Sequence, residues 1–238
     1  MKTKIEYIWR VDGSDIFYTP ETNGGGDYFF GEYLNLVMEN YGRVHHLMEW
    51  CSGPGFIGYG MMACNVCDHL TLLDKFEPAV EVAKKTAENS FIKTIDLVDT
   101  EKVYHRRVFP RTTIYHSDTC SVLSDYKLDL VVGNPPHFEC KEDAIKALSA
   151  MGSPIFNDHL SEILLDPNWD AHRDMFREVS TRLSDDGTIC LQLHSGGSSA
   201  DTFRSMVEEA GMRITGTFNS VQYDDTVSYT HLTLPTSG

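Results

Sequence analysis

The chain has 238 residues, 41% of them hydrophobic, and a formal net charge of −15 at pH 7. This length suits one α/β domain, or one domain with a small appendage, and the apolar content is enough for a full core. The acidic balance disfavours nucleic acid as a partner, because binding it usually requires Lys and Arg side chains that neutralise phosphates. No apolar run approaches the roughly 18 residues that span a bilayer, and no signal peptide is evident, so we expect a cytoplasmic protein without membrane contact.

Six cysteines are scattered along the chain, mostly in apolar surroundings. We therefore expect reduced thiols rather than a disulfide framework. The nearest approach to a zinc motif is the run Cys64-x-x-Cys67-Asp68-His69. Because no second pair of Cys or His residues lies at ligand spacing, we expect no metal site.

The first 26 residues are expected to form a hairpin arm. β-like runs at 4–10 and 14–19 flank the sequence Val11-Asp12-Gly13, which is typical of a hairpin turn. A glycine-rich break at 22–26 then separates the arm from the domain that follows.

Beyond this break, strands and helices alternate. We assign 27–226 to one domain with a doubly wound, mostly parallel α/β sheet and helices on both faces. The expected strands are 44–50, 69–73, 112–116, 128–132, 188–193 and 212–218. The expected helices are 28–41, 56–66, 77–89, 141–150, 171–183 and 202–210. Asp27 is expected to cap the first helix, with Phe30, Leu34, Val37 and Met38 on one face.

The last dozen residues, 227–238, differ in character from the preceding sequence. They are polar and resemble translated cloning or adapter sequence. We therefore expect a non-native or disordered tail outside the domain, and a final strand that is altered or missing.

A glycine-rich turn joins the first strand of the domain to the next helix, in the sequence Glu49-Trp50-Cys51-Ser52-Gly53-Pro54-Gly55-Phe56-Ile57-Gly58. Glycine lets the backbone turn sharply and approach a ligand closely, and the start of the helix offers free N–H groups and a positive dipole end. Such a turn is suited to a nucleotide-like ligand. With Asp74 further on, the spacing also fits the dinucleotide fingerprint of an NAD-dependent oxidoreductase.

The sequence Asn134-Pro135-Pro136-His137 closes a later strand. A proline restricts the preceding residue to extended geometry and fixes its own φ, so two in a row make a stiff strand exit. The Asn134 amide oxygen and the Pro135 carbonyl can then accept the two hydrogens of a planar NH₂ group. An oxidoreductase would leave this element without a task.

Together, Glu49 with the spaced glycines and the Asn-Pro-Pro-His sequence resemble the first and fourth motifs of class I S-adenosylmethionine-dependent methyltransferases, in their amino-methylating branch. The resemblance covers roughly Tyr33 to Phe218. It implies a seven-stranded, Rossmann-like methyltransferase sheet and S-adenosylmethionine as the cofactor.

The resemblance also implies roles for residues at successive strand ends. The glycine turn would hold the methionine moiety, Asp74 the ribose hydroxyls and Asp118 the adenine amino group. Carboxylates suit the last two tasks because those groups donate hydrogen bonds. The expected cofactor-binding residues are Glu49, Cys51, Gly53, Gly55, Asp74, Lys75, Asp118, Thr119 and Asn134. The expected catalytic residues are Asn134, Pro135, Pro136 and His137.

Two positions depart from the family pattern. Cys51 lies where the family usually has glycine, and His137 lies where it commonly has Tyr or Phe.

The implied reaction is methyl transfer to a planar amide or amino nitrogen. The nearest resemblances are the release-factor glutamine N5-methyltransferases and the adenine N6 or guanine N2 enzymes that act on RNA and DNA. The acidic charge favours a protein glutamine or a small molecule as acceptor over a nucleic acid. A catalytically idle binding module remains a further alternative.

Overall fold

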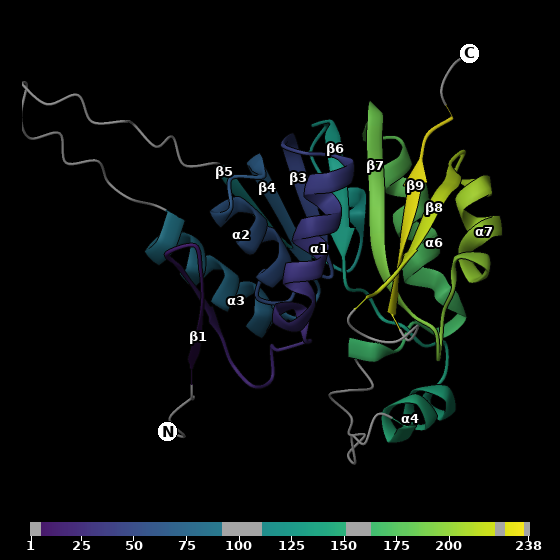
Figure 1. Cartoon of the computed structure of the whole chain (residues 1–238), viewed down its shortest axis with the longest axis horizontal. Helices are drawn as coiled ribbons and strands as arrows, with labels where there is room; N and C mark the ends of the chain where they lie inside the picture. The colour runs from purple at the N-terminus through teal and green to yellow at the C-terminus, as the bar shows by residue number, and fades with distance from the viewer. Residues whose placement is uncertain (1–5, 92–110, 151–162, 222–226, 236–238) are drawn as a thin grey trace, which may run out of the picture.

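A seven-stranded sheet forms the centre of the structure (Figure 1), which is a computed structural model that describes residues 6–91, 111–150, 163–221 and 227–235. Its strands are β3 (Val44–Trp50), β4 (Cys67–Asp74), β5 (Arg111–His116), β6 (Leu128–Gly133), β7 (Leu183–His194), β8 (Arg213–Asn219) and β9 (Val227–Thr233). Their order across the sheet is β5-β4-β3-β6-β7-β9-β8. The five strands from β3 to β7 are parallel, and β9 is antiparallel to both of its neighbours. The prediction of a doubly wound, mostly parallel sheet is confirmed.

The order of the strands reverses between β3 and β6. From β3 the chain moves outward through β4 and β5, and then returns to place β6 on the other side of β3, with Trp50 opposite Gly133. At such a switch point the loops leave in opposite directions, so a crevice opens outside the carboxyl ends of the strands.

Helices cover both faces of this sheet (Figure 1). They are α1 (Gly26–Asn40), α2 (Phe56–Ala63), α3 (Glu77–Thr86), α6 (Asp170–Ser180) and α7 (Ala200–Glu209), whereas α4 (Lys141–Ala150) lies beyond the ends of the strands. Because side chains alternate along a strand, neighbouring residues of β3 enter different cores. Leu47 packs with α1 and α2 on one face, and Met48 packs with α6 and α7 on the other.

Helix α1 begins earlier than predicted, and its buried face includes the predicted Phe30 and Val37 but is centred on Tyr33 and not on Met38. Its N-cap is Gly25, with φ of 85°, and Asp27 lies in the first turn instead. Met38 is 48% exposed, whereas Tyr33 is fully buried. The Tyr33 hydroxyl donates to the carbonyl of Cys190 and accepts from the N–H of Gly133. These bonds to the backbone of β6 and β7 select the face of α1 that meets the sheet.

Strand β9 corrects the prediction for the C-terminal residues. Val227–Thr233 does not lie outside the domain, because it pairs with β7 on one side and with β8 on the other. Tyr229 and Leu232 are each 1% exposed, on opposite faces of the sheet. The polar residues between them hid this two-residue alternation in the sequence. Residues 236–238 lie outside the described part of the chain.

The N-terminal hairpin has the predicted form, with strands β1 (Tyr7–Val11) and β2 (Ser14–Tyr18). Asp12 and Gly13 both have positive φ, as a type I′ turn requires. Ile16 is fully buried, and the ring of Trp9 packs edge-on against Phe30 and Phe56. The hairpin therefore packs onto α1 and α2 as part of the core.

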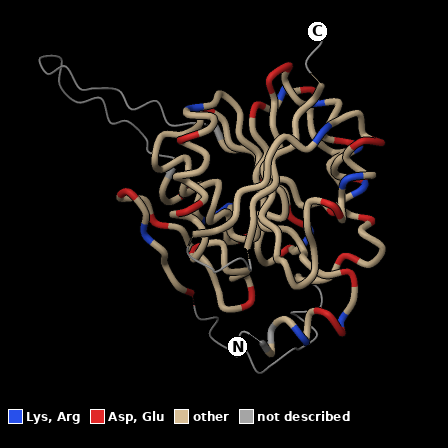
Figure 2. Tube along the Cα trace, turned by 45° about the vertical axis from the view of Figure 1, so that its right-hand side comes forward, with Lys and Arg blue, Asp and Glu red and all other residues tan. Residues whose placement is uncertain are grey.

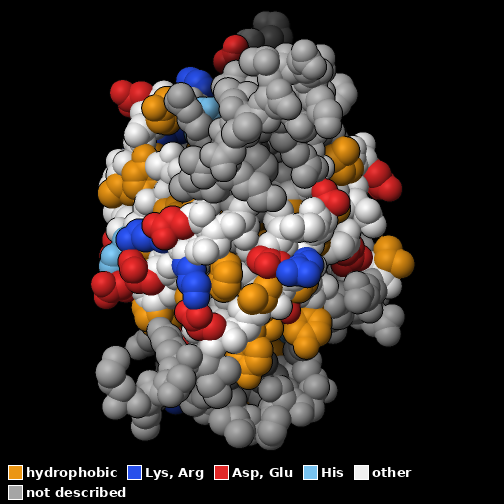
Figure 3. Space-filling model, turned by 90° about the vertical axis from the view of Figure 1, so that its left-hand side faces the viewer, with side chains coloured by type: hydrophobic (Ala, Val, Ile, Leu, Met, Phe, Trp, Pro, Cys, Tyr) orange, Lys and Arg blue, Asp and Glu red, His pale blue; other side chains and the backbone are white. Residues whose placement is uncertain are grey.

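Charged residues lie mainly in the helices and loops around a largely uncharged sheet (Figure 2). On the face shown in Figure 3, where α3 and β1 lie, described Lys and Arg side chains lie next to acidic ones. Lys84 is 2.8 Å from Glu81, and Lys85 pairs with Glu6. On this face the described cations are neutralised in pairs and do not gather into a surface for phosphate.

Within the described ranges, no helix is long and apolar enough to cross a bilayer, and no group of His, Cys, Asp or Glu residues could hold a metal ion. All six cysteines are free thiols.

Deleting residues 227–238 is expected to lower the melting temperature by more than about 10 °C, because β8 loses its partner strand and several buried side chains are lost, each contributing about 1.5–3 kcal/mol. Deleting only 236–238, which keeps β9, is the matched control and should have little effect. Thermal unfolding followed by circular dichroism measures both. Equal melting temperatures for the full chain and the longer deletion would show that β9 is not part of the folded sheet.

Candidate functional site

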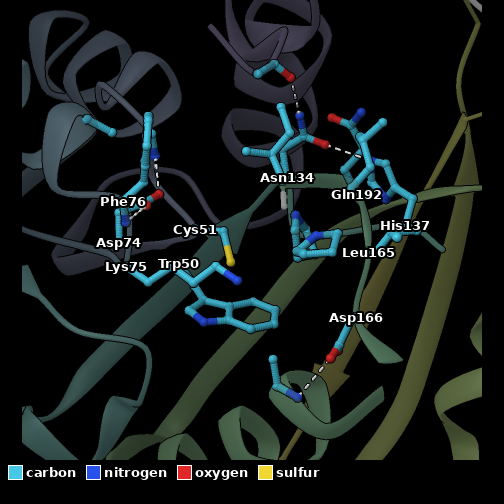
Figure 4. A pocket seen from close by; sticks show the side chains of 18 of the residues that line it. Trp50, Cys51, Asp74, Lys75, Phe76, Asn134, His137, Leu165, Asp166 and Gln192 are labelled. Carbon is cyan, nitrogen blue, oxygen red and sulfur yellow. Dashed lines mark hydrogen bonds between the residues drawn. The ribbon is translucent and has the colours of Figure 1, made fainter. Parts of the chain in front are cut away.

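A cavity of about 330 Å³ opens at the carboxyl ends of the parallel strands (Figure 4). Most of the residues predicted from the sequence line it together. These are Cys51, Gly53, Asp74, Lys75, Asp118, Asn134, Pro135, Pro136 and His137. Three predicted residues, Glu49, Gly55 and Thr119, do not line the cavity.

The turn between β3 and α2 depends on positive backbone φ angles at three positions. Cys51 has φ of 53°, Gly53 of 53° and Gly55 of 86°. A Cβ atom on Gly55 would lie 2.6 Å from the ring of Tyr59, so only glycine fits there. Cys51 adopts an angle that favours glycine. Gly55 thus shapes the turn by packing closely against Tyr59, and it does not line the cavity.

Glu49 also lies behind the turn. Its side chain accepts hydrogen bonds from the N–H groups of Ile57 at 3.3 Å and Gly58 at 2.7 Å. Burial raises the pKa of Glu49 to about 8, although these two donors lower it. Glu49 thus anchors the first turn of α2, where free N–H groups need acceptors.

Asp74 connects the end of β4 to the glycine turn. One carboxylate oxygen accepts from the N–H of Gly53 at 2.6 Å, and the other accepts from the N–H of Phe76 at 2.8 Å. Burial raises the pKa of Asp74, while the two N–H donors lower it. This carboxylate both holds the turn and lines the cavity (Figure 4).

The two site residues predicted after β5, Asp118 and Thr119, take different positions: only Asp118 lines the cavity. Asp118 is exposed and lines the cavity. Thr119 donates from its hydroxyl to Glu178 at 2.7 Å and accepts from the N–H of Ser121 at 3.1 Å. Its side chain therefore ties the loop to α6 and caps a short 3₁₀ turn, Cys120–Val122.

Asn134 and His137 are joined by a hydrogen bond across the two buried prolines. The Nε2–H of His137 donates to Oδ1 of Asn134 at 2.8 Å, and Nδ2 of Asn134 donates to the carbonyl of Gly24 at 3.2 Å. Burial, together with the charges of His194 and His172, lowers the pKa of His137 to about 3. The imidazole is therefore neutral and fixes the direction of the Asn134 amide.

The segment after the prolines is held by residues further along the chain. The N–H groups of His137 and Phe138 both donate to the carbonyl of Leu164 at 3.1 Å, and the N–H of Asp166 donates to the carbonyl of Phe138 at 2.9 Å. The side chain of Asp166 in turn accepts from Nδ1 of His172 at 2.6 Å. These bonds close the cavity on the side of α6.

The cavity is also lined by residues that were not predicted from the sequence, among them Trp50, Asp166, Gln192 and His194. Gln192 and His194 lie at the end of β7, and the rule that ligands bind outside the carboxyl ends of strands would have found them. Asp166 does not follow the end of a strand, so this rule would not have found it, and only the folded chain brings it to the cavity.

No protein-family model matches the chain, and curated protein sequences give no significant match. Solved structures do match in fold. The glycopeptide N-methyltransferase MtfA complexed with sinefungin has a TM-score of 0.56 at 8% identity, with 87% of each chain covered. Magnesium protoporphyrin IX methyltransferase (ChlM) from Synechocystis PCC 6803 with bound SAM has a TM-score of 0.55 at 12% identity, covering 89% of this chain and 80% of that one.

A third structure of this kind is a TehB-like SAM-dependent methyltransferase from Corynebacterium glutamicum ATCC 13032 Kitasato. Its TM-score is 0.53 at 13% identity, and 90% of this chain and 89% of that chain are covered. The chain therefore has the Rossmann-like fold of class I methyltransferases, with the antiparallel strand β9 in its mixed sheet.

His137→Phe is expected to make the protein less sensitive to acid. An unfolded histidine titrates near pH 6.5, whereas His137 in the folded state titrates near 3, so acid favours the unfolded chain between these values. The stability from the neutral ring is complete above pH 6.5 and is lost as the pH falls towards 3. Between pH 6.5 and 4.5 the variant should lose roughly 2–3 kcal/mol less stability than the wild type.

Urea unfolding at each pH measures this difference. The other buried histidines are present in both proteins, so the difference between the two profiles reports His137 together with its coupling to His194 and His172. Parallel stability profiles for the two proteins would contradict a buried, neutral His137.

Proposed function

We propose that the protein is an S-adenosylmethionine-dependent N-methyltransferase that acts on a planar amide or amino nitrogen. The observation that carries this proposal is that two different elements face each other across one cavity. Asp74 and the glycine turn form one wall, and Asn134 with its two prolines and His137 forms the other (Figure 4).

The wall around Asp74 fits the cofactor. Each carboxylate oxygen of Asp74 already accepts one backbone N–H, and each keeps a second lone pair for a ribose hydroxyl. Asp118 offers an exposed acceptor at the same cavity for an exocyclic amine. When bound, S-adenosylmethionine would supply an electrophilic methyl group on its sulfonium sulfur.

The wall around Asn134 fits an acceptor nitrogen. Oδ1 of Asn134 receives one hydrogen bond from His137 and retains a lone pair that can accept an N–H of the substrate. Held in this way, the amide oxygen stabilises the positive charge that develops on the nitrogen during methyl transfer. His137 acts here as a positioning residue, and catalysis rests on orientation and electrostatics.

A protein glutamine or a small molecule is the favoured acceptor, because the net charge is −15 and cations on the described α3 face are neutralised in pairs. An amino group of a nucleic acid is the second candidate, supported by similarity in fold to the B. subtilis M1A22 tRNA methyltransferase TrmK, at a TM-score of 0.51 and 11% identity over 85% of this chain and 65% of that one. The structures named here are methyltransferases, and none of them supports the NAD-dependent oxidoreductase alternative.

Asp74→Ala is expected to weaken binding of S-adenosylhomocysteine by about 1.5–3 kcal/mol, the scale of a hydrogen bond to a charged group. Isothermal titration calorimetry measures the affinity, and NAD titrated alongside should not bind. Asp125→Ala removes an exposed carboxylate that does not line the cavity and serves as the matched control. An unchanged affinity in a folded Asp74→Ala protein would remove Asp74 from the ribose role.

Asn134→Ala is expected to lower kcat about 10²–10³-fold while cofactor affinity stays nearly constant, because the amide acts mainly as the methyl group transfers. Asn134→Asp should lose less, because a carboxylate also accepts the hydrogen bond. Transfer of labelled methyl groups to an acceptor found by mass-shift screening of cell extract measures kcat. Turnover of the alanine variant at the wild-type rate would refute the proposed amino-methylation mechanism.

A further inference from the structure

Two buried polar atoms at the cavity have no task in the mechanism above. Oε1 of Gln192 and Nδ1 of His137 are buried, and neither atom has a hydrogen-bond partner in the described structure. The two residues are 1% and 8% exposed, and both line the cavity. A buried acceptor without a partner is costly, so such atoms at a binding cavity indicate a missing ligand group.

The sheet places these atoms beside the reactive position. β6 and β7 are in parallel register with Gly133 opposite Leu191, so Asn134 and Gln192 each follow the last paired residue by one position. Figure 4 shows Gln192 and His137 near Asn134, across the cavity from Asp74. Gln192 therefore lies on the wall that meets the acceptor.

The chemistry of both atoms is that of a hydrogen-bond acceptor. Because Nε2 of His137 carries the hydrogen that Asn134 accepts, Nδ1 has a free lone pair. The amide oxygen of Gln192 is likewise an acceptor and not a donor. The NH₂ group of Gln192 can donate a hydrogen bond to a carbonyl group of a ligand. A planar group with N–H donors and an adjacent acceptor complements this arrangement.

Charge on this wall selects against anionic ligands. Among the described lining residues here, the one carboxylate is that of Asp166, and it is bonded to His172. Burial lowers the pKa of both His137 and His194, which keeps their rings neutral at pH 7. An anionic group would lose its hydration here without gaining a counter-ion from the described lining residues of this wall.

We propose that Gln192 and His137 form a neutral, hydrogen-bond-accepting subsite that selects the methyl acceptor by its N–H donors. The chemical class it takes is an uncharged primary carboxamide or an amino-substituted ring with an acceptor beside the amino group. That the ligand is a methyl acceptor rests on the proposed function. The hydrogen-bonding preference of the subsite can be measured without any methyl transfer.

The test uses benzamide as a donor probe and N,N-dimethylbenzamide as a matched probe without N–H groups. Binding to the full chain is followed by ligand-observed NMR, with and without saturating S-adenosylhomocysteine. Benzamide should bind the wild type at least about tenfold more tightly than its dimethyl analogue, because loss of one hydrogen bond in a buried site costs about this factor.

Gln192→Met, which keeps the length of the side chain without its polar atoms, should weaken benzamide binding about tenfold and leave the dimethyl analogue unaffected. Gln192→Glu retains an acceptor oxygen in either protonation state and should retain the preference for benzamide. Melting temperatures show whether the variants fold. The comparison of the two probes on the wild type stands even if Gln192→Met does not fold.

Equal affinity of the wild type for both probes, no binding of benzamide, or an unchanged preference in folded Gln192→Met overturns the subsite. If S-adenosylhomocysteine binds neither the wild type nor the variants while the preference for benzamide remains, the proposed function is overturned. A carboxamide-binding subsite is then what is left. The two failures are therefore distinguishable.

Discussion

The site depends on two acidic side chains, Glu49 and Asp74, that hold the turn between β3 and α2 from opposite sides. Glu49 bonds the first amides of α2 from within the core, and Asp74 bonds the amide of Gly53 from the cavity. The turn needs this support because Cys51, Gly53 and Gly55 all have positive φ angles. With the turn fixed, the ends of β3 and β4 form one rigid wall of the cavity.

The opposite wall is stiffened by different means. Two prolines limit the backbone after β6, and the hydrogen bonds from His137 to Asn134 and from Asn134 to Gly24 orient the amide. Residues 164–166 then hold the backbone that follows. The side chains of this wall are thus oriented before a ligand binds, which reduces the entropy lost on binding.

The central strands were predictable because each is a short apolar run followed by a turn signal. β3 has the predicted bounds, and the ends of β4 and β6 lie at Asp74 and Gly133, beside the predicted site residues. Because the central strands are parallel, their carboxyl ends meet at one edge of the sheet, and this brings together Asp74, Asp118 and Asn134. Glu49 and Thr119 show the limit of this rule, because residues at strand ends also cap helices and turns.

The sequence by itself determined the alternating α/β order, the glycine turn and the stiff Asn-Pro-Pro exit, since these depend on local propensity and backbone restriction. Only the tertiary structure decided the place of β9, whose two-residue alternation is masked by polar residues and acquires meaning between β7 and β8. It also decided the bond of His137 to Asn134 and the burial of Gln192. Contacts between distant segments set hydrogen-bond partners and burial, and no local pattern encodes them.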